Sequence, residues 1–151
     1  MRISRLPVSE AWERWLSEGN ITLEKFIGQN DGVELIEKAF TGDGERCVWF
    51  AFGNEEWYQK GDPGELNRLL MGPMALGFLG ENGYREVTSP QDYDIVVYPS
   101  RELQDMGYID HYGVYIAGGV VSKLGRLHIV RHELEVIPCG FGDEVIFLRK
   151  P

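Results

Sequence analysis

The sequence holds 151 residues, the length of one ordinary domain, and nothing in it requires a second. Its composition, 43% hydrophobic and 26% charged, is that of a globular protein and excludes a low-complexity chain. Twenty-four acidic residues against fifteen basic ones give a net charge of -9, which repels phosphate groups. We therefore expect neither nucleic acid nor an anionic membrane as a partner.

The cysteines and the first residues bear on the compartment. The two cysteines, Cys47 and Cys139, are expected to be thiols, because a core of this size needs no disulfide. Arg2 and Arg5 are followed by no continuous apolar stretch, so no secretory signal is expected, and no segment has the apolar length of a membrane span. A cytoplasmic protein is the expectation, with export by a route that uses no cleaved signal left open.

Residues 1–45 are expected to form a helical extension packed on a core of residues 45–151, all within a single domain of residues 1–151. Ser9 is a candidate N-cap, and Trp12 and Trp15 lie at helical spacing after it. Residues 21–40 are expected to add one or two further helices. The two tryptophans are expected to dock the first helix onto the domain, and a face for a protein partner is the alternative.

The next segment is also expected to be helical. Residues 47–52 form an apolar run that predicts a buried helix, and Asp62 followed by Pro63 predicts the start of another. Residues 74–81 add one more helical piece.

From residue 84 onward the pattern changes to short strands. About six are expected, drawn from residues 84–87, 94–98, 111–117, 120–123, 127–130, 134–137 and 144–148. Gly118 and Gly119 are typical of a two-residue hairpin turn. Helices followed by strands predict an α+β domain with a mostly antiparallel sheet.

Cys47 is the leading candidate for chemistry. It follows a loop at residues 41–46 that contains two glycines and Asp43, and it opens the apolar helix, where backbone N–H groups and the helix dipole favour a thiolate. His111 is the candidate base. The alternative is that Cys47 is a small hydrophobic residue in the core.

These residue types allow three other interpretations. A metal site formed by His111, His128 and His132 is disfavoured, because a strand separates the last two by about 13 Å. Cys139 could serve as the nucleophile of a permuted arrangement, but no helix follows it to activate the thiol. His132 is expected to have a structural role at a strand end.

The order of parts resembles the papain-like NlpC-type peptidases and the related CHAP amidases. Their second strand motif, approximately His-Val-Gly-Ile-Tyr, is matched closely at residues 111–116. Their first motif, Gly-Asp followed by hydrophobic residues, is matched in part, with Tyr93 and Asp94 at its start. Arg46 and Val48 flank the cysteine where the superfamily commonly has Asp-Cys-Ser-Gly. The resemblance covers about two thirds of the chain, from residue 45 to residue 148.

The resemblance implies a papain-like core and a cysteine hydrolase that cleaves an amide bond, in a cell-wall peptide or a protein isopeptide, without a cofactor or metal. It implies Cys47 as nucleophile, His111 as general base and acid, and a third residue that orients the imidazole, for which Ser122 and His128 are the candidates.

Aromatic side chains are the candidates for substrate binding. Trp49 is expected to shape the pocket, and Trp57 and Tyr58 either line a cleft beside Cys47 or lie at its rim as ordinary aromatics. The alternative function is a catalytically inactive papain-like domain that binds a protein partner.

Overall fold

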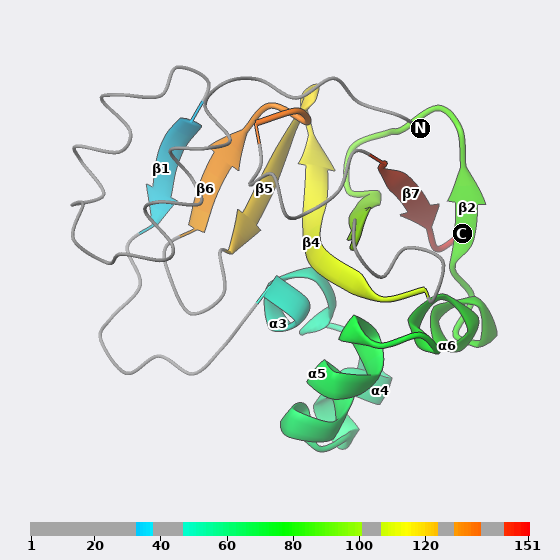
Figure 1. Ribbon diagram of the computed structural model, residues 1–151. Helices are drawn as coiled ribbons and strands as arrows, with labels where there is room; N and C mark the ends of the chain where they lie inside the picture. Colours follow the sequence, from blue (N-terminus) through cyan, green and yellow to red (C-terminus); the bar gives the residue numbers. More distant parts are fainter. Residues whose placement is uncertain (1–32, 38–46, 101–106, 124–128, 137–143) are drawn as a thin grey trace.

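The computed structural model describes residues 33–37, 47–100, 107–123, 129–136 and 144–151 (Figure 1). These residues contain four helices and a seven-stranded antiparallel sheet, which confirms the predicted α+β class. The helices are α3 (Cys47–Phe52), α4 (Glu56–Lys60), α5 (Pro63–Met71) and α6 (Ala75–Glu81). The strands are β1 (Val33–Glu37), β2 (Arg85–Val87), β3 (Ile95–Pro99), β4 (Ile109–Ile116), β5 (Gly119–Lys123), β6 (Ile129–His132) and β7 (Ile146–Arg149).

The strands lie in the order β1-β6-β5-β4-β3-β7-β2, with each strand antiparallel to its neighbours. The inner strand β3 is buried along its whole length. Its β-branched residues suit a strand that is covered on both faces, and Pro99 stands at its end, where a missing N–H is tolerated. The candidate residues of β4 therefore lie on the strand beside the best-buried part of the sheet.

The helices cover one face of the sheet, which we call the helix face. In Figure 1 they gather below the strands, with α3 under the lower part of β4. The core on this face joins helical residues to sheet residues that include Ile95, Val97, Tyr112 and Leu148. The opposite face, which we call the far face, carries a second core of Val96, Tyr98, Val120, Val145 and Phe147. Because side chains alternate along a strand, neighbouring residues of β3 or β4 belong to different cores.

Local sequence accounts for the predicted helix starts. The Asp62 side chain accepts a hydrogen bond from the backbone N–H of Glu65 at 2.9 Å, and Pro63 occupies the first position of α5. This is the cap that the Asp-Pro pair predicts. No helix in the described part of the chain is long and apolar enough to cross a membrane.

The structure corrects three details of the sequence prediction. Residues 33–37, expected within a helical extension, form strand β1, which pairs with β6 at the edge of the sheet. Residues 134–136, expected in a strand, belong to a turn closed by a hydrogen bond from the Val136 N–H to the Glu133 carbonyl. The β4–β5 hairpin turns at Ala117 and Gly118, whose φ angles are both positive, rather than at Gly118 and Gly119.

Other expectations concern residues outside the described ranges. These are the helices of residues 1–32, the rest of the extension at 38–46, and the side chains of Trp12, Trp15, His128 and Cys139.

Candidate functional site

Cys47 opens α3, as predicted, and its side chain lies in the helix-face core. It is only 5% exposed and belongs to the same cluster as Val48, Phe52 and Tyr112. Burial raises the pKa of the Tyr112 hydroxyl, and the negative charge that Cys47 carries as a thiolate raises it further. The residue of β4 that faces Cys47 is therefore Tyr112.

His111 precedes Tyr112 on β4, so its side chain points from the far face. It pairs across the sheet with Tyr98, and the two rings pack with centroids 5.8 Å apart. Burial, and to a lesser degree the charge of the nearby His132, lower the pKa of His111 to about 3. His111 is thus a neutral imidazole at neutral pH.

The structure does not bring Cys47 and His111 together. The cysteine packs with the helices on one face of the sheet, and the histidine packs against Tyr98 on the other. Strand alternation is the physical reason, because only one of His111 and Tyr112 can face α3. The sequence motif places a histidine on the correct strand but leaves open which side of that strand faces the helix.

Ser122, a candidate for the third residue that orients the imidazole, also lies on the far face. Ser122 is fully buried, and its hydroxyl lies 3.2 Å from Nε2 of His132. The Nδ1 of His132 lies 2.7 Å from the Glu133 carbonyl oxygen, so Nδ1 carries the proton and Nε2 accepts from Ser122. Ser122 therefore donates to His132 at the end of β6.

The aromatic residues predicted for substrate binding are placed by packing. The Trp57 ring lies 5.6 Å from the Phe52 ring and 5.1 Å from the Phe78 ring, and Tyr58 packs against the same cluster. Trp49 is half-buried within α3. Trp57 and Tyr58 therefore pack against the helix-face core. Within the described residues, no group of three or more His, Cys, Asp or Glu side chains is placed to hold a metal ion.

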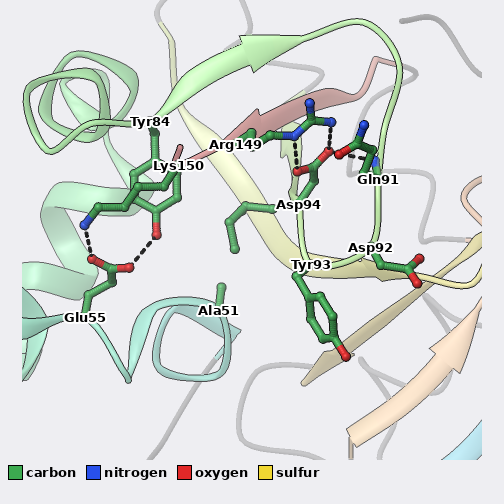
Figure 2. A pocket seen from close by; sticks show the side chains of 10 residues that line it. Ala51, Glu55, Tyr84, Gln91, Asp92, Tyr93, Asp94, Arg149 and Lys150 are labelled. Atoms are coloured by element: carbon green, nitrogen blue, oxygen red, sulfur yellow. Dashed lines mark hydrogen bonds and ion pairs between the residues drawn. The ribbon is translucent and has the colours of Figure 1, made fainter.

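A pocket that the sequence did not predict lies where the loop before β3 meets α3 and the end of β7. Its volume is about 310 Å³ (Figure 2). Ten residues line it: Ala51, Glu55, Tyr84, Gln91, Asp92, Tyr93, Asp94, Ile95, Arg149 and Lys150. Three of them are acidic and two are basic, so the wall is polar and charged.

One wall is the ion pair of Asp94 with Arg149. The guanidinium donates from Nε to one carboxylate oxygen at 2.8 Å and from Nη2 to the other at 2.7 Å. The Gln91 N–H adds a third hydrogen bond at 2.8 Å. The hydrogen bonds from Arg149 lower the pKa of Asp94, although burial opposes them. This forked geometry fixes the start of β3 to β7.

The opposite wall is centred on Glu55, which follows α3. Its carboxylate accepts hydrogen bonds from Lys150 at 2.6 Å and from the Tyr84 hydroxyl at 3.1 Å. Burial raises the pKa of Glu55, but these hydrogen bonds outweigh burial and leave the pKa below its ordinary value. Burial and the charge of Glu55 raise the pKa of Tyr84. The carboxylate stays ionised and already has a cation.

Tyr93 stands between these walls in an unusual backbone conformation. Its φ is 75°, in the left-handed region that bulky residues rarely adopt, and its side chain is 77% exposed. The Tyr93 N–H donates to the Tyr115 carbonyl at 2.7 Å, which holds the loop against β4. A large aromatic ring is thus displayed to solvent at a cost of about 1–2 kcal/mol in backbone strain.

The sequence contained a signal for this site. Tyr93 stands where the resembled motif has glycine, the residue that adopts a positive φ without strain. Asp94, which follows Tyr93 in the partly matched motif, pairs with Arg149. Comparisons with family models, with curated proteins and with solved structures found no match to this chain.

Proposed function

We propose that this chain is a catalytically inactive papain-like domain that acts as a protein-interaction module. A short helix headed by Cys47, followed by antiparallel strands and a tight hairpin, supports the papain-like part of the proposal. The observation that carries the functional part is the separation of Cys47 and His111 onto different faces of the sheet.

Chemistry explains why that separation matters. A cysteine hydrolase needs an imidazole within hydrogen-bond reach of the thiol, first to accept its proton and later to protonate the leaving amine. His111 packs on Tyr98 on the far face, and Tyr112 stands on the strand where a base would be needed. A tyrosine hydroxyl whose pKa is raised by burial does not take a proton from a thiol near neutral pH.

A binding role is supported by the pocket around Tyr93. An exposed aromatic ring on a strained, hydrogen-bonded loop is costly to the fold, and such strain concentrates at functional sites. Exposed aromatic residues are also enriched among the residues that dominate protein interfaces. The loop at residues 88–94 contains neither cysteine nor histidine, and binding is the role we assign to it.

The reactivity of the Cys47 thiol provides a direct test of the proposal. In a Cys139→Ser background, the rate of Cys47 alkylation by iodoacetamide is measured against pH, with and without His111→Ala. We expect slow labelling at about pH 6 in both proteins, because an unactivated thiol has a pKa of about 8.5. Labelling in urea provides the control that the thiol is chemically competent. Rapid labelling at about pH 6 that His111→Ala abolishes would establish the dyad and restore the hydrolase.

A further inference from the structure

We infer that the Tyr93 pocket binds an arginine or lysine side chain presented by a basic segment of a partner protein. The inference rests on the proposed role of the domain in protein binding. It follows from the one acidic side chain of the pocket that pairs with no cation among the described residues, and from the ring of the next residue.

The three carboxylates of the pocket differ in their partners. Asp94 is paired with Arg149, and Glu55 is paired with Lys150. Asp92 is exposed and accepts one hydrogen bond, from the backbone N–H of Ala117 at 2.8 Å, and none of the cations among the described residues pairs with it. A carboxylate has about four acceptor sites, so most of its capacity remains. Because Asp92 is exposed, these acceptor sites are accessible to a cation from outside the chain.

Tyr93 offers that cation the face of an aromatic ring. Figure 2 shows the Asp92 and Tyr93 side chains pointing away from the Asp94 and Arg149 pair, each in its own direction from the loop. A guanidinium or ammonium group over the tyrosine ring gains a cation–π interaction, and the carboxylate of the adjacent residue adds a charged hydrogen bond. Ala51 and Ile95 supply apolar wall for the aliphatic stem of the side chain.

The loop is ordered before any partner arrives. Asp92 and Tyr93 each share a hydrogen bond with the strand-turn unit at residues 115–117, and Asp94 caps the N–H of Gln91. A preformed site has less conformational entropy to lose on binding. The net charge of -9 adds a long-range attraction for a basic partner.

The test uses the full chain labelled with ¹⁵N and three blocked pentapeptides at millimolar concentration. The first is Gly-Gly-Arg-Gly-Gly. The second has neutral citrulline and the third has glutamate in place of arginine. We expect the arginine peptide to shift the amide signals of Asp92, Tyr93 and Ala117, and to bind roughly tenfold more tightly than the citrulline peptide.

Two variants locate the effect. Asp92→Asn keeps an oxygen that can accept from the Ala117 N–H but removes the charge, and it is expected to weaken arginine binding several-fold. Tyr93→Ala is expected to weaken it similarly by removing the ring. Met74→Ala alters a residue that is 71% exposed and does not line the pocket, and it is the control expected to bind normally. The amide spectrum of each variant reports whether it is folded.

The possible results separate the two proposals. Equal binding of the citrulline and arginine peptides, or no shift at the pocket amides, overturns the cation inference while a slow-reacting Cys47 keeps the proposed function. Rapid labelling of Cys47 that His111→Ala abolishes overturns the proposed function whatever the peptides do. Binding of the glutamate peptide in preference to arginine also overturns the inference.

Discussion

Mild acid is expected to destabilise this fold through two buried histidines, His111 and His132. Both lie on the far face, 2% and 1% exposed. Burial lowers the pKa of His111 from 6.5 to about 3 and that of His132 from 6.5 to about 4. For His132 the Glu133 carbonyl partly opposes burial, and the positive charge of Arg131 adds to it.

The direction of the pH effect follows from whether the folded or the unfolded chain binds the proton. As the pH falls below the ordinary histidine value, the unfolded chain takes up protons that the folded chain cannot, so the free energy of unfolding falls. At about pH 5 both histidines are still neutral in the folded state. Each then lowers the free energy of unfolding by about 2 kcal/mol, or by about 4 kcal/mol for the pair. A typical domain has a stability of about 5–15 kcal/mol, so the loss is large. Asp94, whose pKa is lowered, adds its own loss only at still lower pH.

Urea denaturation at a series of pH values measures this loss. The chain has three histidines, so a His128→Gln background leaves only the two buried ones. In that background the slope between about pH 6 and pH 5 should approach two protons, and either His111→Gln or His132→Gln should remove about one. A free energy of unfolding that is unchanged between about pH 7 and pH 5 would refute the reasoning, because it would mean that the histidines titrate normally in the folded protein.

Three substitutions test other parts of the structure by urea or thermal denaturation. Tyr93→Gly should stabilise the fold by about 0.5–1 kcal/mol, because relief of the positive φ exceeds the entropy that glycine adds to the unfolded chain; destabilisation would contradict the strain. Tyr112→Phe removes the hydrogen bond from the hydroxyl to the Leu70 carbonyl, and should cost about 1–2 kcal/mol; an unchanged midpoint would mean that the bond contributes nothing. Gly113→Ala would place a Cβ 2.5 Å from a methyl group of Val120, and should cost about 1–3 kcal/mol, with partial recovery on adding Val120→Ala; simple additivity of the two changes would argue against that clash.

Much of the fold could be predicted because its signals are local. The Asp62-Pro63 pair caps α5, and the apolar run from Cys47 ends at Phe52 as expected. The β-branched residues of β3 identify it as a buried strand. Each of these features depends on neighbours within a few residues, so composition and spacing reveal it.

The rest depends on contacts between distant segments. Residues 33–37 have an apolar pattern that suits either a helix or a strand, and pairing with β6 decides for the strand. Whether His111 or Tyr112 faces α3 depends on how the sheet packs on the helices. The pocket beside Tyr93 forms where β7 brings Arg149 to Asp94. Such pairings cannot be read from one stretch of sequence.

The position of β7 has a consequence for synthesis. β7 lies between β3 and β2, so β2 cannot pair at Arg85 until β7 has been synthesised as far as Arg149. From Pro99, the end of β3, to Ile146, the start of β7, the ribosome adds 47 residues, which takes roughly 2–9 s at about 5–20 residues per second. During that time β3 lacks its second neighbour, and an unpaired strand edge invites pairing with another chain. A nascent chain stalled before residue 146 therefore keeps one edge of β3 unpaired.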